Sequence, residues 1–591
     1  DLKRNHLSDS ARCLMYKIGV DVGGTHTDGM CIDERGELKE AKVRSTPEDP
    51  SIGMMNCLKN LADIYGLDAR SFLSNVSLIV HGTTIATNAI INESGAKTGI
   101  ITTKGYRDLL DLPAIPKPDM FNLKWGPWKF FSPRYLRMEV EERLNEKGQV
   151  LIPLNEGDVH NAAHKLKERG AEAIAILYLF SFFNSVHENR TEEIVKQEFP
   201  EAYVCTSSRV LPVVGEWQRL TTTLLSAYVG PITEKYLRNL VIKLKEGGFR
   251  GTLLIMQNNS GVQSPEIAMQ RPATILSSGP AAGPTAALIT SDSENIIAVD
   301  MGGTSFDVTV IPKRTVPTTT DYVLKWHACA LPTVAVYSIG AGGGSIAWFD
   351  VTGSLKVGPQ SAGAVPGPAC YNMGGEKATV TDADLVLGYL NPDYFLGGAM
   401  KLHKDLAEKA IKKEVSDRLG IDVINAADAI YSVINAVMSD ELTLRTVRAG
   451  YDPREFTLCI GGGAGATHAV RLAEHIGIKK VLVPKIASGL CSFGMVNTDL
   501  RHDYMQTYWR ELKDVDYDEL TKMYGKLEDD AVKTLRSEGI AEKDIILSRY
   551  MDVQYYGQFR TVEVEMPSGP VTKASLDTLI DRFHRKHKDV I

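Results

Sequence analysis

Two phrases of this sequence repeat one spacing of residues that suits chemistry with phosphates. The first runs from Ile18 to Asp28 and the second from Ile297 to Asp307, and each places Asp-x-Gly-Gly-Thr-x-x-Asp at the end of a short apolar run. Corresponding residues of the two phrases are 279 positions apart. Paired glycines let the backbone approach a bound group closely, and successive backbone N–H groups can wrap phosphate oxygens. The repeat therefore predicts two similar hairpins that hold one nucleotide from two sides.

The first acidic residue of each phrase, Asp21 and Asp300, ends the apolar run. A carboxylate at the end of a strand, beside a triphosphate, is well placed to hold Mg²⁺ directly or through water. We therefore assign Asp21 and Asp300 to catalysis and to Mg²⁺ binding. One copy alone is equally typical of an ordinary β-turn, but two copies in the same context favour a nucleotide site. The turn residues assigned to the nucleotide are Gly23, Gly24, Thr25, Gly302, Gly303 and Thr304.

Two further glycine-rich loops fit the same nucleotide. One precedes a short apolar run at Ile346, and the other follows a predicted strand over 456–460 and opens a helical pattern through His475. Backbone amides at the start of a helix form a ready anion site, although each loop alone is also typical of a plain turn. No G-x-x-x-x-G-K-[ST] motif is present, which disfavours a P-loop. The residues assigned here are Gly342, Gly343, Gly461, Gly462, Gly463 and Gly465.

Three other segments carry candidate polar chemistry. His81 opens His-Gly-Thr-Thr-Ile-Ala-Thr-Asn, which follows a predicted strand and could orient a polar substrate; a helix cap is the alternative. We assign His81 as catalytic. Two close carboxylates in Thr379–Asp384 fit either a cation or substrate site or a capped helix start. Glu216 and Arg219 lie three residues apart on a predicted helix, where a surface ion pair is the simple interpretation.

Composition excludes several classes of protein. At 591 residues the chain is too long for one hydrophobic core, and 43% hydrophobic with 24% charged residues is typical of globular proteins. The net charge of −7 without a basic stripe argues against nucleic acid as a partner. Eight scattered cysteines without a CxxC pair indicate a reducing cytoplasm. The longest apolar run, 173–183, is too short to cross a membrane, so we expect no membrane partner.

The ordered motifs of this sequence resemble those of the hydantoinase A/oxoprolinase family, whose fold is related to actin, hexokinase and the Hsp70 ATPase. The resemblance runs from about Tyr16 to the end of the chain. It is carried by the segments 19–28, 81–88, 276–283, 300–307, 338–345, 367–371, 379–384, 462–465 and 499–503. So long an ordered set is specific for the family and much less specific for the substrate.

The resemblance implies an α/β fold with two ribonuclease-H-like lobes and a smaller C-terminal α+β domain. We expect residues 1–15 to form an N-terminal extension, 16–210 the first lobe, 211–498 the second lobe and 499–591 the C-terminal domain, which we expect to be incomplete. ATP with Mg²⁺ would lie between the two lobes, with the Gly461–Gly465 loop facing the adenosine.

The resemblance also implies an activity. Family members use ATP to phosphorylate a carbonyl or amide substrate, which is then hydrolysed (hydantoin, 5-oxoproline or a lactam) or carboxylated (acetone or acetophenone). The segments at His81 and 367–371 are similar to the hydrolase branch, whereas 488–494 and 554–560 are nearer to the ketone carboxylases. We expect cyclic-amide hydrolysis, a carboxylase subunit as the alternative and an ATP-gated switch as the lesser one. A second subunit of the hydantoinase B type is the implied partner.

Overall fold

The computed structural model describes residues 16–46, 48–114, 121–124, 128–558 and 561–590. The expected N-terminal extension lies outside these ranges, as does the end of the 554–560 segment. The chain divides into two compact units, both discontinuous in sequence. Unit 1 comprises Asp1–Gly95, Val229–Lys325 and Leu331–Asp499; unit 2 comprises Ala96–Tyr228, Trp326–Ala330 and Leu500–Ile591. The lobe boundaries expected from the sequence stay a prediction.

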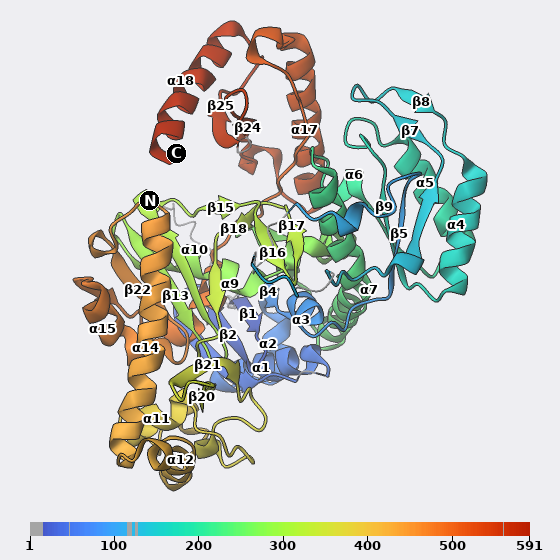
Figure 1. The fold of residues 1–591 in the computed structure, drawn as a ribbon. Coiled ribbons are helices and arrows are strands. Elements are labelled where there is room, and N and C mark those ends of the chain that lie inside the picture. The colour runs from blue at the N-terminus through green and yellow to red at the C-terminus, as the bar shows by residue number, and fades with distance from the viewer. Residues whose placement is uncertain (1–15, 47, 115–120, 125–127, 559–560, 591) are drawn as a thin grey trace. The chain divides into compact units, whose positions relative to one another are not determined.

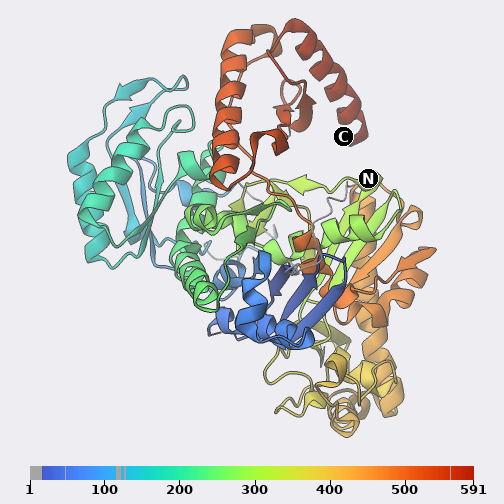
Figure 2. The same cartoon turned by 180° about the vertical axis from the view of Figure 1, so that it is seen from behind.

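Unit 1 contains a six-stranded sheet in the order β12-β11-β4-β1-β2-β3. Its first three strands form an antiparallel meander, and β4 and β11 run parallel beside β1. In Figure 1 strands β1 to β4 are blue, and Figure 2 shows the same sheet from behind. The bounds are β1 Tyr16–Val22, β2 His26–Ile32, β3 Leu38–Arg44, β4 Val76–Thr83, β11 Thr252–Met256 and β12 Val262–Gln263.

The second sheet of unit 1 has the order β19-β14-β13-β22-β23 and repeats the same plan. Here β13, β14 and β19 form the antiparallel meander, and β22 and β23 run parallel beside β13. The bounds are β13 Ile296–Met301, β14 Phe306–Ile311, β19 Tyr337–Ile339, β22 Thr457–Gly461 and β23 Lys480–Leu482. The repeat seen in the sequence is thus a repeat of strand order, and the expected pair of ribonuclease-H-like sheets is confirmed.

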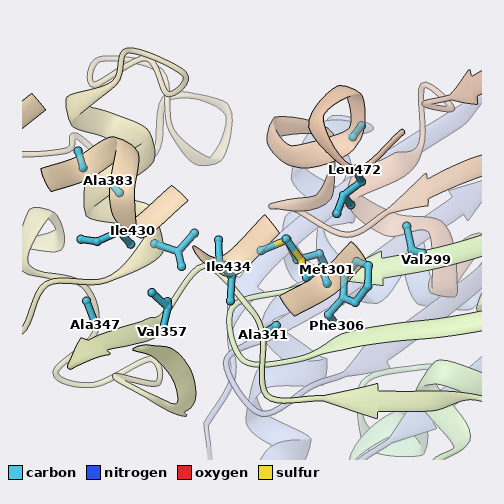
Figure 3. Packing of buried hydrophobic residues seen from close by; sticks show 14 of the residues in the cluster. Val299, Met301, Phe306, Ala341, Ala347, Val357, Ala383, Ile430, Ile434 and Leu472 are labelled. Atoms are coloured by element: carbon cyan, nitrogen blue, oxygen red, sulfur yellow. The ribbon is translucent and has the colours of Figure 1, made fainter. Parts of the chain in front are cut away.

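The second sheet packs on an apolar core formed with three helices: α11 (Val380–Val386), α14 (Val423–Arg448) and α15 (Gly465–Ile476). Figure 3 shows this core, in which Met301 and Phe306 from the hairpin lie near Ile434 of α14. Burying such side chains is the main favourable term that holds a helix layer on a sheet.

Helix α16 (Leu490–Val496) packs against the first sheet through glycines. A methyl group on Gly19 of β1 would lie 2.0 Å from the carbonyl oxygen of Ser492, and one on Gly82 of β4 would lie 2.1 Å from Met495 Cε. The Ser492 hydroxyl also donates a hydrogen bond to the Asp28 carbonyl at 2.8 Å. The helix therefore contacts the strands almost backbone to backbone.

Unit 2 contains a parallel four-stranded sheet in the order β10-β9-β5-β6. Its strands are β5 Thr98–Thr103, β6 Arg137–Val140, β9 Ala173–Leu177 and β10 Tyr203–Thr206. In the sequence, α4 (Glu156–Glu168) lies between β6 and β9, and α5 (Val186–Glu198) lies between β9 and β10. A separate apolar cluster joins α17 (Tyr517–Ser537), β24 (Arg549–Val553), β25 (Val562–Met566) and α18 (Lys573–Val590). The expected C-terminal α+β region is present.

Arg219 corrects one expectation from the sequence. Its side chain, on α7 (Glu216–Glu246), is fully buried rather than part of a surface ion pair. It donates to the hydroxyls of Ser181 and Ser207, and Glu188 lies 3.8 Å away. A buried guanidinium requires such partners, which spacing along one helix does not reveal.

No single helix in the described ranges is both long and apolar enough to cross a membrane. The pair Lys404–Leu419 and Val423–Arg448, bent by 88°, reaches that length and composition only when its two parts are added together. Apolar residues of both parts, including Ile411 and Ile430, belong to the core described above.

The packing of α16 leads to a stability prediction. We expect Gly19→Ala to lower the midpoint of thermal unfolding strongly, because the added methyl group meets a backbone atom that can yield only if α16 shifts. Overpacking of this kind typically costs about 1–3 kcal/mol. Gly525→Ala is the matched control, since nothing lies within 4 Å of a methyl group there. Differential scanning fluorimetry measures both, and an unchanged midpoint for Gly19→Ala would contradict the packing.

Candidate active site

Each hairpin places its two acidic residues directly opposite one another. Asp21 of β1 pairs in register with Asp28 of β2, and Asp300 of β13 pairs with Asp307 of β14. Side chains at directly opposed positions of an antiparallel pair lie on the same face of the sheet, and like charges there repel. Both sheets of unit 1 therefore carry a carboxylate pair at the equivalent edge.

The carboxylates of the two hairpins act on one another. Burial raises the pKa of Asp21 to about 7, and Asp28, Asp300 and Asp307 add to the rise while Lys42 opposes it. The pKa of Asp307 is also raised to about 7, by burial and then by Asp300. Burial raises the pKa of Asp300 as well. The interactions between residues almost 280 positions apart show that the two hairpins meet at one site.

One cation and one thiol stand out among these carboxylates. The Lys42 ammonium forms an ion pair with Asp28. The Cys491 thiol of α16 donates a hydrogen bond to Asp300 Oδ2 at 3.2 Å. The buried oxygens Asp21 Oδ1 and Asp307 Oδ1 have no hydrogen-bond partner within the described chain. Buried oxygens without partners call for a ligand, an ion or water, so this site fits a bound cation.

The two Gly-Gly-Thr turns lie close together. A methyl group on Gly303 would lie 3.6 Å from the Thr25 hydroxyl. A small hollow is lined by Thr25 and Gly303 together with His26 and Arg44. The other lining residues are Gly344, Gly363, Ala364, Pro368, Tyr371 and Met400. The pKa of His26 is lowered to about 4, mainly by burial and then by Lys42. Arg44 is thus the cationic side chain that lines this hollow near neutral pH.

The Gly342–Gly344 loop rests on the second turn. Gly343 N–H donates to the Gly302 carbonyl at 3.0 Å, and Gly344 N–H donates to the Gly303 carbonyl at 2.7 Å. The Thr381 hydroxyl in turn donates to the Gly343 carbonyl at 2.8 Å. The assigned residues of this loop are therefore held directly against the second hairpin.

The Gly461–Gly465 loop packs against Asp300. Gly462 has a φ of +83°, and a methyl group there would lie 2.6 Å from Asp300 Oδ1. Only glycine suits both the conformation and the close approach. Gly465 then begins α15. The loop assigned to the nucleotide thus joins Asp300 to the start of a helix.

Near the first hairpin, a fourth segment meets Asp21. A methyl group on Gly279, in α9 (Ser278–Ala281), would lie 2.9 Å from Asp21 Oδ1. The sequence singled out the surrounding motif but did not assign Gly279, and it also left out Asp28, Asp307, Lys42, Arg44 and Cys491. The repeat contains Asp28 and Asp307, so a consistent reading of it would have found them; the other residues come from segments without such a signal.

His81 lies beside the carboxylates in sequence register but faces away from them. It pairs with Val20, whereas Gly82 pairs with Asp21, and side chains alternate between the faces of a strand. The ring is fully buried, with Nδ1 3.2 Å from the Val20 carbonyl oxygen and Nε2 2.8 Å from the Tyr236 hydroxyl. Burial lowers the pKa of His81 to about 4. Both ring nitrogens are used within the protein core.

The two carboxylates of Thr379–Asp384 have different roles. Asp382 completes a capping box with Thr379 and accepts a hydrogen bond from Cys370 N–H at 2.8 Å, so the capped helix start is confirmed. Asp384 instead lies 3.6 Å from His468 Nε2, and both are buried. Because Asp384 belongs to α11 and His468 to α15, this pair connects the two helices. Helix α11 holds the Gly343 loop, and α15 begins at Gly465.

These features define a class of protein. Two sheets of one strand order, each ending in an Asp-x-Gly-Gly-Thr hairpin, are the architecture of the ATPases related to actin and hexokinase. The comparison with known sequences is more specific. The hydantoinase/oxoprolinase family matches residues 219–504, its N-terminal region matches 17–199, and its C-terminal domain matches 507–591. The chain belongs to this family.

The relatives include both cyclic-amide hydrolases and ketone carboxylases. The chain is 36% identical to the caprolactamase subunit alpha of Pseudomonas jessenii, over 97% of this chain and 84% of that protein. It is 34% identical to the acetophenone carboxylase gamma subunit of Aromatoleum aromaticum, over 93% of this chain and 78% of that protein. Both relatives are thus named as subunits of enzymes.

Two solved structures agree with the fold. The ATP-dependent caprolactamase of Pseudomonas jessenii superposes with a TM-score of 0.85 at 35% identity, covering 97% of this chain and 84% of that chain. A nucleotide-free acetone carboxylase gives a TM-score of 0.82 at 29% identity, covering 98% and 85%. The relatives match both the expected cyclic-amide hydrolase and the carboxylase alternative.

The raised pKa of Asp21 leads to a prediction about pH. Because that pKa rises from 3.8 to about 7 on folding, the native protein binds more protons than the unfolded chain between these values. Stability therefore falls as pH rises through this window. We expect Asp21→Asn, which cannot ionise, to have a higher unfolding midpoint than the wild type at pH 8, by several degrees, and no such advantage near pH 4.

Thermal melts without nucleotide at pH 4, 6 and 8 measure this difference. Asp292→Asn is the matched control, because Asp292 is exposed. The same shift at all three pH values would contradict the raised pKa.

Proposed function

We propose that this chain binds ATP between its two Asp hairpins and uses it to phosphorylate a cyclic amide, which is then hydrolysed. The observation that carries this proposal is the meeting of the two hairpins at one buried carboxylate cluster in a member of this family. The phosphates would lie on the N–H groups of Gly24, Thr25, Gly303 and Thr304 and on the two threonine hydroxyls, because the N–H groups of Gly23 and Gly302 close the turns by donating to His26 and Ser305. The adenosine would lie toward the Gly461–Gly465 loop, where α15 begins.

Asp21 and Asp300 would hold the Mg²⁺ of MgATP, directly or through water. Four carboxylates with Lys42 beside them leave the site short of positive charge, and two of their buried oxygens lack partners. In the described residues no three side chains form a metal cage by themselves, and Mg²⁺ in ATP sites is usually bound by one or two carboxylates plus phosphates and water. Mg²⁺ would supply neutralisation of the phosphate charge.

The protein's own groups would position the reactants and exclude water. An amide oxygen is a poor leaving group, and its phosphorylation by ATP provides a better one. The hollow lined by Thr25, His26 and Arg44 adjoins both phosphate turns, and we propose that the substrate carbonyl enters there. Arg44 would stabilise the negative charge that develops on the transferred phosphoryl group.

His81 would act through the first hairpin. Its hydrogen bond to Val20 holds β4 against β1, and its hydrogen bond to Tyr236 holds β4 against α7, one residue before Gly82 meets Asp21. This geometry supports a positioning role for His81.

The cyclic-amide assignment rests on the relatives. The caprolactamase subunit is the more similar of the two relatives described above and covers almost the whole chain. The acetophenone carboxylase gamma subunit supports the second candidate, an ATP-using subunit of a ketone carboxylase. Because both relatives are named as subunits, we further propose a second subunit of the hydantoinase B type as partner. We also propose a cytoplasmic location, which the scattered cysteines without a CxxC pair support.

The role of the carboxylates can be tested by substitution. We expect Asp300→Asn and Asp21→Asn each to lower substrate-stimulated ADP release by roughly 100-fold or more, since each removes a charged group from the transition-state environment. Asp292→Asn, on the surface, should retain full activity. Circular dichroism verifies that the variants are folded. Near-normal ADP release by both folded variants would refute the nucleotide site.

The substrate class can be tested with a panel. ADP release is measured with the purified chain, alone and together with a candidate subunit of the hydantoinase B type. The panel contains caprolactam, hydantoin and 5-oxoproline, and separately acetone and acetophenone with bicarbonate. We expect stimulation by a cyclic amide together with a ring-opened product. Stimulation by a ketone alone would establish the carboxylase candidate, and ATP hydrolysis indifferent to every compound would favour an ATP-gated switch.

A further inference from the structure

Unit 2 has a basic hollow that the nucleotide chemistry does not use. It is lined by Arg107, Arg134, Tyr135, Arg137, Met138, Lys165 and Arg169, all within residues 96–228, and has a cavity volume of about 490 Å³. Ligand pockets typically measure about 300–1,000 Å³. We name these residues the basic hollow.

Three structural elements bring the cations together. Arg107 follows β5, Arg134 and Arg137 flank the short turn that leads into β6, and Lys165 and Arg169 lie at the end of α4. In the sheet, β6 is an edge strand next to β5. Cations at the C-terminal end of α4 are favoured by the helix dipole. The fold thus collects side chains from positions 107 to 169 around one hollow.

The local carboxylates pair with only part of this charge. Arg134 forms a two-pronged ion pair with Asp108, at 2.7 and 2.9 Å. Arg137 forms another with Asp111, at 2.7 and 3.1 Å, although its own side chain is only 5% exposed. These pairs fix the two guanidinium groups in place.

The remaining three cations have weaker or no carboxylate partners. Arg107 Nε lies 4.0 Å from Glu139, and this buried nitrogen has no hydrogen-bond partner in the described structure. Arg169 donates to the Tyr135 carbonyl, a neutral group. Among the described residues, nearby lysines form the ion pairs Lys104–Glu141 and Lys167–Glu201, whereas neither Lys165 nor Arg169 forms one. Five cations therefore face three carboxylates around one hollow.

We propose that the basic hollow binds a small, multiply charged oxyanion, such as a free phosphate or pyrophosphate. Guanidinium groups present forked donors that match phosphate oxygens, and fixed guanidinium groups lose little freedom on binding. The ends of Lys165 and Arg169 supply the unspent donors. This site is separate from the proposed nucleotide site, whose residues all belong to unit 1.

The test measures pyrophosphate binding to the full chain by isothermal titration calorimetry, with saturating ADP present to occupy the nucleotide site. We expect binding that ADP does not prevent. Lys165→Gln/Arg169→Gln should weaken it by about 10-fold or more, because charge-assisted hydrogen bonds to the anion are lost. Arg190→Gln/Lys196→Gln is the matched control: it removes the same charge from α5 of the same unit, where both residues have carboxylate partners.

Several outcomes would overturn the proposal. They are no binding of pyrophosphate or inorganic phosphate, loss of binding when ADP is added, and equal weakening by the control pair, which would show a general charge effect. Recruitment of the partner subunit that depends on Lys165 and Arg169, without binding of either free anion, would assign the hollow to a protein contact instead. Lys165→Glu/Arg169→Glu, checked by its melting temperature, gives a second variant with a larger expected loss.

Discussion

The removal from water of three carboxylates, Asp21, Asp300 and Asp307, at the ends of two strand pairs constrains the whole of unit 1. Opposed like charges destabilise a hairpin, and removal from water raises the free energy of each ionised group. The protein offers Lys42, the Cys491 thiol and close backbone as local partners, yet it leaves Asp21 Oδ1 and Asp307 Oδ1 without any in the described chain. An arrangement so costly for the fold supports the proposal that this site binds a cationic ligand complex.

The surrounding glycines follow from the same constraint. Backbone must approach the carboxylates where side chains would collide, so Gly279 meets Asp21 and Gly462 meets Asp300. The segments that contain them come from distant parts of the sequence: Gly279 lies in α9, and Gly462 lies in the loop that leads into α15. Helix α15 is in turn connected to α11, which holds the Gly343 loop, by the Asp384–His468 pair. Stability and function thus rest on different groups. The apolar core stabilises the sheet and its helices, whereas the carboxylate oxygens without partners lie at the hairpins.

The sequence predicted the parts of this design that repeat or that are local. The duplicated motif predicted two similar sheets. The apolar run 456–460 predicted the strand observed as β22, and the helical pattern through His475 predicted the helix observed as α15. It could not predict that α16 would reach Asp300, because Cys491 lies almost 200 residues from that carboxylate and in no motif of the repeat. The expected surface ion pair of Arg219 was wrong for a related reason, because the partners of Arg219 lie outside its helix. They are Ser181, Ser207 and Glu188, all earlier in the sequence. The His81 motif showed polar residues but not which face of β4 each would occupy.

Helix α16 has one consequence for motion. Its backbone lies against Gly19 of the first sheet, Gly494 lies against the Ala282 carbonyl, and Cys491 reaches Asp300 of the second sheet. The sheets therefore share a short rigid part instead of a flexible tether. Any rotation of one sheet relative to the other must therefore either carry α16 with it or break one of these contacts.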